Sequence, residues 1–203
     1  MTANTSTLFG EDRESGGLSI GAGPGRPGQV IRLHPQTRQR RLDWLTWGLL
    51  PPAMALAGGI HARAETVADL PLFANAFRHR RALVPAAAYY QRRTIGGAGE
   101  RFAIARPDGQ PLAIAGLWEA FRRSDGEIAR TYCIITVAAR GVIAEIHDRM
   151  PLVLDEPDWP VWLGEVLGDP VALLDPPAAY RLVLRPLHGG KSRAARSGKT
   201  ARV

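Results

Sequence analysis

The feature that most constrains the fold is a succession of short apolar runs separated by turn-forming residues. Arg101–Ala105 and Leu112–Leu117 flank a turn at Pro107–Gln110, in which Asp-Gly is strong turn chemistry. Thr131–Val137 is apolar and rich in β-branched residues, as buried strands are. The first two runs are therefore predicted to form a hairpin. The whole chain is predicted to form an α+β domain with a mainly antiparallel, curved, barrel-like sheet and short flanking helices.

Further elements follow from similar patterns on either side. The other predicted strands are Val30–Leu33, Leu42–Leu50, Ala82–Pro85, Ala87–Gln91 and Tyr180–Leu184. The predicted helical segments are Leu72–Phe77, Val142–Ile146, Asp155–Leu163 at the surface and Val171–Leu174, the first of them capped by Thr66–Asp69. Trp44 and Trp47 lie on one predicted strand, and either can stack on unpaired bases. For Trp44 we expect burial in the core instead.

Composition divides the chain into three parts. Residues 1–29 are rich in Gly, Ser, Thr and Pro and are interpreted as a flexible arm, residues 30–188 as the folded domain, and residues 189–203 as a basic tail. The formal net charge is +7, and seven Lys/Arg with no acid fall between residues 181 and 203, so the rest is neutral overall. Such a tail attracts phosphates without sequence preference, or it only solubilises a disordered end. Both interpretations stay open.

The sequence argues against a membrane protein, a disulfide-bonded protein and a metal-binding protein. No run approaches the ~20 apolar residues of a membrane span, and the start lacks the basic and apolar blocks of a secretory signal. We therefore expect a cytoplasmic protein with no membrane partner, acting as a monomer. The single cysteine, Cys133, excludes an internal disulfide and a multi-cysteine zinc site, and its apolar surroundings predict a buried hydrophobe. We expect no metal and no cofactor.

One charged triplet, His147, Asp148 and Arg149, stands between two apolar runs. His147 is a candidate for proton transfer because an unperturbed imidazole titrates close to neutral pH. Arg149 offers a planar fork that clamps anions. On the triplet alone, a solvated turn with a local ion pair is the more frequent explanation of such a motif.

Five separated segments, in order, resemble one family. They are Trp47–Pro51, His61–Thr66, Arg81–Pro85 leading to Tyr89–Gln91, Ile134–Ala138 and Ile146–Leu154. Together they resemble the SOS-response-associated peptidase (SRAP) family over roughly residues 20 to 188. Five matches in register are far stronger evidence than one motif, so the resemblance favours a functional role for His147 over a solvated turn.

The resemblance implies a DNA-damage protein that recognises abasic sites in single-stranded DNA and joins to them covalently. In the family an N-terminal cysteine, exposed after methionine removal, attacks the ring-opened sugar aldehyde, and its amine and thiol close a thiazolidine. A histidine at the position of His147 helps to open the sugar. A glutamate and an asparagine complete the site, and an arginine near the asparagine, here Arg63, holds backbone phosphate.

This chain departs from that pattern at three positions. Thr2 stands where the family has cysteine, His61 where it has asparagine, and Gln91 where it has glutamate. An amide cannot exchange a proton as a carboxylate does, and Cys133, being mid-chain, has no α-amine with which to close a thiazolidine. We therefore expect covalent crosslinking to be impaired. A start codon that differs from the ancestral one would explain the missing cysteine but not His61 or Gln91.

Two other hypotheses stay open, and they leave open whether the protein is an enzyme. Thr2 offers an amine and a hydroxyl for an altered abasic-site reaction or a peptidase-like self-processing reaction with His147. Alternatively, the protein is a non-catalytic interaction scaffold. The predicted catalytic residues are His147, Gln91, His61 and Thr2. The predicted nucleic-acid contacts are Arg63, Thr136, Arg149 and Trp47.

Overall fold

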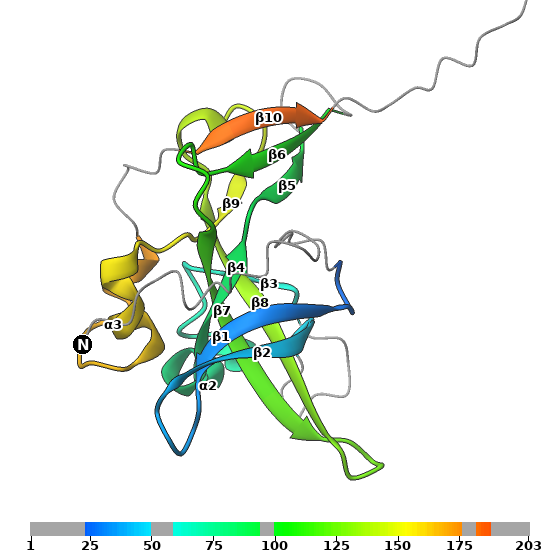
Figure 1. Ribbon diagram of the computed structural model, residues 1–203, viewed down its shortest axis with the longest axis vertical. Helices are drawn as coiled ribbons and strands as arrows, with labels where there is room; N and C mark the ends of the chain where they lie inside the picture. Colours follow the sequence, from blue (N-terminus) through cyan, green and yellow to red (C-terminus); the bar gives the residue numbers. More distant parts are fainter. Residues whose placement is uncertain (1–22, 50–58, 94–99, 176–181, 188–203) are drawn as a thin grey trace, which may run out of the picture.

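Five strands close into a barrel in the computed structural model, which describes residues 23–49, 59–93, 100–175 and 182–187 (Figure 1). These strands are β1 (Pro27–Leu33), β2 (Arg40–Trp47), β4 (Arg81–Ala86), β7 (Leu112–Arg122) and β8 (Ile128–Ala138). They are hydrogen-bonded in the order β2, β1, β4, β7, β8, and β2 also pairs with β8, which closes the ring. The predicted α+β class with a curved, barrel-like sheet is confirmed.

Strand β8 is the central element, because it pairs with four other strands. It runs antiparallel to β7 and to β9 (Arg149–Pro151), and parallel to β3 (His61–Arg63) and to a short part of β2. Its residues from Thr131 to Val137 are all buried, as the continuous apolar run predicts. The chain enters β8 from β7 by a turn at Asp125 and Gly126, where Gly126 takes φ +89°.

The predicted hairpin of residues 101–117 is wrong. The turn exists, since Asp108 Oδ1 accepts the backbone N–H of Gln110 at 3.0 Å and Gly109 takes φ +75°. However, the turn leads from one sheet into another. Strand β6 (Arg101–Ala105) lies between β5 (Tyr89–Arg92) and β10 (Val183–Leu187) in a separate three-stranded sheet, whereas β7 belongs to the barrel. Turn chemistry fixed the reversal of the chain but not the pairing partner.

The helices are short and cover the outside of the barrel. Helix α2 (Pro71–His79) buries Phe73, Ala76 and Phe77; its N-cap is Leu70, without a side-chain cap, so the predicted capping by Thr66–Asp69 is wrong. Proline at the first helical position sets the backbone there instead. The predicted surface helix is α3 (Trp159–Leu163), preceded by the 3₁₀ turn η2 (Glu156–Asp158), and its buried Trp162 donates an indole hydrogen bond to the carbonyl of Ala82.

Two more 3₁₀ turns, η1 (Gly141–Ile143) and η3 (Ala172–Leu174), occupy predicted helical segments. Strand β1 begins at Pro27 rather than Val30, so residues 27–29, placed in the arm by composition, pair with β2. None of the helices in the described parts of the chain is long and apolar enough to cross a membrane.

The two tryptophans of β2 differ sharply in burial. Leu45 and Trp47 are 2% and 9% exposed and face the barrel interior, whereas Trp44 is 66% exposed. The expected core role of Trp44 is therefore wrong. Successive strand residues point to opposite faces, so Trp44 stands on the outer face of β2.

Candidate functional site

An open cavity of about 810 Å³ lies at one end of the barrel, where the ends of β2, β3, β8 and β9 meet β5 of the small sheet. Its walls include seven residues that the sequence singled out: Trp47, His61, Arg63, Gln91, Thr136, His147 and Arg149. Thr2, the eighth, lies outside the described residues. The fold thus brings together side chains from positions 47 to 149.

Strand β3 presents its polar residues to this cavity by simple alternation. His61 and Arg63 are exposed while Ala62 between them is fully buried, as the spacing predicts. The strand lies parallel to β8, with His61 opposite Ile134 and Arg63 opposite Thr136. Residues opposite each other share a face of the sheet, so both strands supply the same wall.

Arg149 holds this wall together. Its two terminal nitrogens donate to the carboxylate of Glu65 at 2.6 and 2.9 Å, and Nη2 also donates to the carbonyl of Thr136 at 2.6 Å. The guanidinium hydrogen bonds hold the pKa of Glu65 below its usual range. The fork of Arg149 is therefore committed to protein groups, and it ties β9 to β8 and to the turn after β3.

His147 follows the η1 turn and is 24% exposed. Its Nδ1 accepts the backbone N–H of Arg149 at 2.9 Å and lies 2.9 Å from a carboxylate oxygen of Asp148. In the neutral ring, an Nδ1 that accepts a hydrogen bond places the proton on Nε2. Nε2 is then the ring nitrogen available to a molecule in the cavity, because Nδ1 is occupied by the backbone N–H of Arg149.

His61 lies against aromatic rings on the opposite wall. Its ring centroid is 5.8 Å from that of Trp47, which in turn stacks on Tyr132 at 6.2 Å. Trp47 is fixed by an indole hydrogen bond to the carbonyl of Ile60 at 2.9 Å. Although part of His61 reaches solvent, the surrounding atoms displace enough water to lower its pKa. His61 is therefore neutral at neutral pH, suited to accept or donate a hydrogen bond.

The small sheet contributes Gln91, which the sequence predicted, and also Tyr89 and Arg101, which it did not. Gln91 is half-buried on β5. Tyr89, on the same strand, is 4% exposed, and its hydroxyl has no hydrogen-bond partner among the described residues. Burial raises the pKa of Tyr89, so its hydroxyl is a donor rather than an anion. Arg101 of β6 also lines the cavity. Tyr89 could have been predicted as a site residue because it belongs to the Tyr89–Gln91 segment that resembles the family. No local sequence signal marks Arg101.

The charge of the cavity is positive. Arg149 is balanced by Glu65, whereas Arg63 and Arg101 have no ion-pair partner in the described part of the chain. Two guanidinium groups without a carboxylate in ion-pair contact favour an anionic ligand such as a phosphate. No group of three or more His, Cys, Asp or Glu side chains suited to a metal ion occurs among the described residues.

Cys133 does not contribute to this site. It is fully buried on β8, opposite Leu117 of β7, and burial raises the pKa of its thiol to about 12. A buried thiol with this pKa supplies almost no thiolate at neutral pH, so Cys133 is not a nucleophile. Its predicted role as a small core residue is confirmed.

A barrel whose end carries a basic cavity with two histidines is suited to bind an anionic ligand. The family described as SOS response associated peptidase (SRAP) matches residues 6–188, and the chain belongs to this family. It is 33% identical to the abasic site processing protein YobE of Bacillus subtilis over 135 residues, which are 64% of this chain and 62% of that protein. It is also 33% identical to the abasic site processing protein YedK of Escherichia coli over 141 residues, 69% of this chain and 63% of that protein.

Solved structures agree with the fold. A protein from Bordetella bronchiseptica superposes with a TM-score of 0.71 at 29% identity, covering 81% of this chain and 85% of that one. A protein from Bacteroides thetaiotaomicron, at 21% identity and a TM-score of 0.69, shares the fold. The matched part of this chain spans less than two thirds of the length of YobE and of YedK.

Proposed function

We propose that this protein recognises abasic sites in single-stranded DNA at the barrel-end cavity, as part of a DNA-damage response. The observation that carries the proposal is the meeting of two histidines with two uncompensated arginines, Arg63 and Arg101, in one open cavity. Both relatives compared above are named as abasic site processing proteins, which supports the same conclusion.

In this proposal Arg63 and Arg101 bind the phosphates that flank the lesion, and the missing base leaves room beside Trp47 and His61. When its ring is protonated, His147 donates the Nε2 proton to the sugar ring oxygen as the bond from C1 to that oxygen breaks. The C1 hydroxyl gives its proton to water, so the products are the aldehyde and a neutral imidazole. Asp148 lies 2.9 Å from Nδ1 of that ring. Arg149, although predicted to bind nucleic acid, has its fork on Glu65 and Thr136. We assign it the positioning of the His147 loop, with Thr136 as part of the wall.

We propose that covalent capture is impaired. Cys133 is buried away from the cavity, and the residues at the glutamate and asparagine positions of the family are Gln91 and His61. The amide of Gln91 cannot exchange a proton as the carboxylate of the family does. An amine of Thr2 acting as the nucleophile is the alternative; a non-catalytic scaffold is a further one.

The direct test is a denaturing gel of the full chain with an abasic strand and an intact strand, with and without borohydride trapping. We expect abasic-dependent retention on a native gel and little adduct on the denaturing gel. A strong trapped adduct that is attached to the α-amino group of Thr2 by mass spectrometry and is lost in His147→Ala would favour the Thr2 reaction instead. Equal failure of abasic and intact strands to bind at low salt would refute DNA recognition and favour the scaffold.

We also propose a monomer that acts in the cytoplasm, with an arm that ends before β1, a domain that runs from β1 through residue 188, and a basic tail over residues 189–203. The charge pattern supports a salt-sensitive contribution of the tail to DNA binding. Comparing the full chain with one truncated after residue 188 measures that contribution. An unchanged salt dependence would assign the tail to solubility alone.

A further inference from the structure

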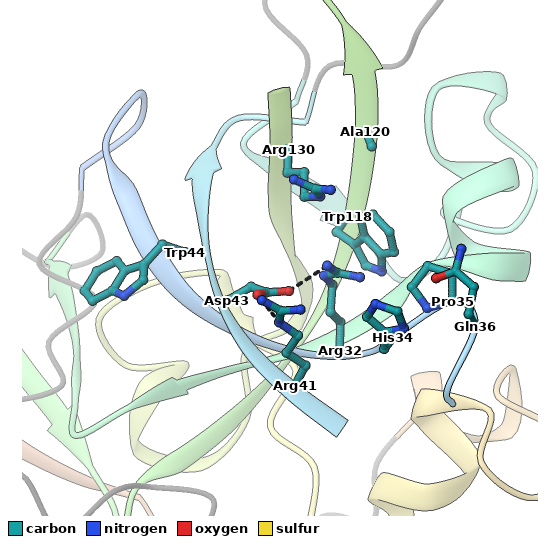
Figure 2. Close-up of a pocket in the computed structure, with 10 residues that line it drawn as sticks. All are labelled: Arg32, His34, Pro35, Gln36, Arg41, Asp43, Trp44, Trp118, Ala120 and Arg130. Atoms are coloured by element: carbon teal, nitrogen blue, oxygen red, sulfur yellow. Dashed lines mark ion pairs between the residues drawn. The ribbon is translucent and has the colours of Figure 1, made fainter. Parts of the chain in front are cut away.

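A second cavity, of about 330 Å³, lies at the other end of the barrel (Figure 2). We call it the mouth, and its walls include Arg32, Arg41, Asp43, Trp118, Ala120 and Arg130. None of these residues belongs to the candidate site described above. The two cavities have no lining residue in common.

Strand register explains why these side chains converge. Arg32 of β1 lies opposite Arg41 of β2, and Ala120 of β7 lies opposite Arg130 of β8, so each pair shares a face of the sheet. On β8, every second residue from Arg130 faces the same way, through Tyr132 and Ile134 to Thr136 in the first cavity. Six residues at about 3.3 Å each place the two cavities roughly 20 Å apart along the strand.

The mouth holds more positive charge than its own acid can balance. Asp43 is the carboxylate there, and it is shared between Arg32 at 2.6 Å and Arg41 at 2.8 Å. Arg130 is exposed and has no ion-pair partner within the described residues. Three guanidinium groups against one carboxylate leave an excess of two positive charges.

Arg32 is the unusual member, because it is only 5% exposed. Its guanidinium lies 4.3 Å from the centre of the Trp118 ring, and its Nε is buried without a hydrogen-bond partner among the described residues. The oxygen of Asp43 nearest to it lies in ion-pair contact but without hydrogen-bond alignment. Burial lowers the pKa of Arg32, Asp43 raises it, and the like charge of Arg130 lowers it. An incompletely compensated buried cation is stabilised by a bound anion.

Strand β2 connects this mouth to the candidate site. Trp47, at one end of β2, lines the first cavity, and Arg41, near the other end, lines the mouth. Trp44, also on β2, is 66% exposed and lines the edge of the mouth, with its ring turned away from the arginine cluster (Figure 2). An exposed indole at the edge of a cationic cavity can stack on an unpaired base of a strand whose phosphate the cavity binds.

We propose that the mouth binds a backbone phosphate of a single DNA strand that leaves the candidate site along the outer face of β2, with Trp44 stacking on a base at the edge of the mouth. This inference rests on the proposed function, since it concerns the same strand. It adds a second contact about 20 Å from the lesion. Binding is therefore expected to depend on strand length.

The test compares two abasic strands, of about four and about sixteen nucleotides, by fluorescence anisotropy over a series of salt concentrations. Arg130→Ala is expected to weaken binding of the long strand and to reduce the slope of log affinity against log salt by about 0.7, the value for one lost single-strand phosphate contact. Arg123→Ala is the matched control, because Arg123 is exposed on the same β7–β8 hairpin but lines neither cavity. The control is expected to change the slope much less.

Variants of Trp44 give an independent test of the proposal. Trp44→Ala is expected to weaken the long strand at least about fivefold, whereas Trp44→Phe, which keeps a stacking face, retains most of the affinity. Neither variant is expected to change the affinity for the short strand. Equal effects of Arg130→Ala and Arg123→Ala, or effects independent of strand length, would overturn the proposal.

A final arm identifies the source of the phosphate. Inorganic phosphate at millimolar concentration is added as a competitor, and its effect on wild type is compared with that on Arg130→Ala. Weak competition, confined to the long strand, supports a strand phosphate, whereas tight phosphate binding with no length dependence overturns it. If the short abasic strand also fails to bind wild type, the proposed function itself has failed, and the two failures are thereby distinguished.

Discussion

Arg149 and Arg32 stand at opposite ends of the same barrel and are compensated in opposite ways. Arg149 is the one ion-pair partner of Glu65 among the described residues: both of its terminal nitrogens donate to that carboxylate, and Nη2 also donates to the carbonyl of Thr136. Arg32 shares the carboxylate of Asp43 with Arg41. In both residues Nε is buried without a hydrogen-bond partner in the described chain, so the contrast lies in the carboxylate alone. The difference teaches that an arginine in a cavity is a candidate for binding an anionic ligand only if its guanidinium is not already balanced by a carboxylate of the protein.

The largest expected effect separates the two tryptophans of β2. Trp47→Ala removes a buried ring packed on Tyr132 and His61, so we expect the free energy of unfolding to fall by about 3–5 kcal/mol. Trp44→Ala removes an exposed ring and is expected to change it by less than about 0.5 kcal/mol. Urea titrations of both variants measure this. Similar losses in both would mean that Trp44 is packed in solution.

The next largest effect tests the mouth. Arg32→Ala leaves Asp43 to Arg41 alone and removes the contact with Trp118, so we expect a loss of about 2–3 kcal/mol by chemical denaturation. Arg32→Met keeps the packing and removes the poorly compensated charge, and it should be clearly more stable than Arg32→Ala. A methionine variant as unstable as the alanine variant would contradict the view that Arg32 is under-compensated.

A smaller effect tests the opposite end through pH. The pKa of Glu65 is lower in the folded chain than in the unfolded one, so its pair with Arg149 stabilises fully above about pH 4.3 and loses this stabilisation as pH falls through the folded-state pKa. Because Glu65 is half exposed, we expect a contribution of only about 1 kcal/mol. Glu65→Gln should lose that amount at pH 7 and little at pH 3. Denaturation of both proteins at the two pH values measures it.

The smallest effect concerns His61. Burial lowers its pKa, so its neutral form is favoured in the folded chain, and the associated stabilisation is present above about pH 6.5 and lost as pH falls through the folded-state pKa. An NMR titration of the imidazole should give a midpoint below that of free histidine. His61→Asn should remove this resonance and flatten the pH dependence of stability by a few tenths of a kcal/mol. A midpoint at or above 6.5 would show that the ring is fully hydrated.

The sequence predicted the barrel class and the residues of the larger cavity well, because both leave local traces. Alternation placed His61 and Arg63 on one face, and motifs in register located His147 and Gln91. The partner of Arg149 was out of reach, since Glu65 lies 84 positions away and only the pairing of β3 and β9 with β8 brings the two together. The mouth was missed for the same reason, because Arg32 and Arg130 meet only through the register of four strands.

Gly28 and Tyr132 have a consequence for how this barrel can change over evolutionary time. A Cβ atom at Gly28 would lie 2.3 Å from the hydroxyl of Tyr132, whose ring is 2% exposed and sits between the two cavities. A side chain at position 28 can therefore be accepted only together with a smaller residue at position 132. In a set of related sequences the two positions should covary, with large residues at 132 accompanying glycine at 28. The two positions would then be constrained together, and the side chain that separates the two ends of the barrel would be retained.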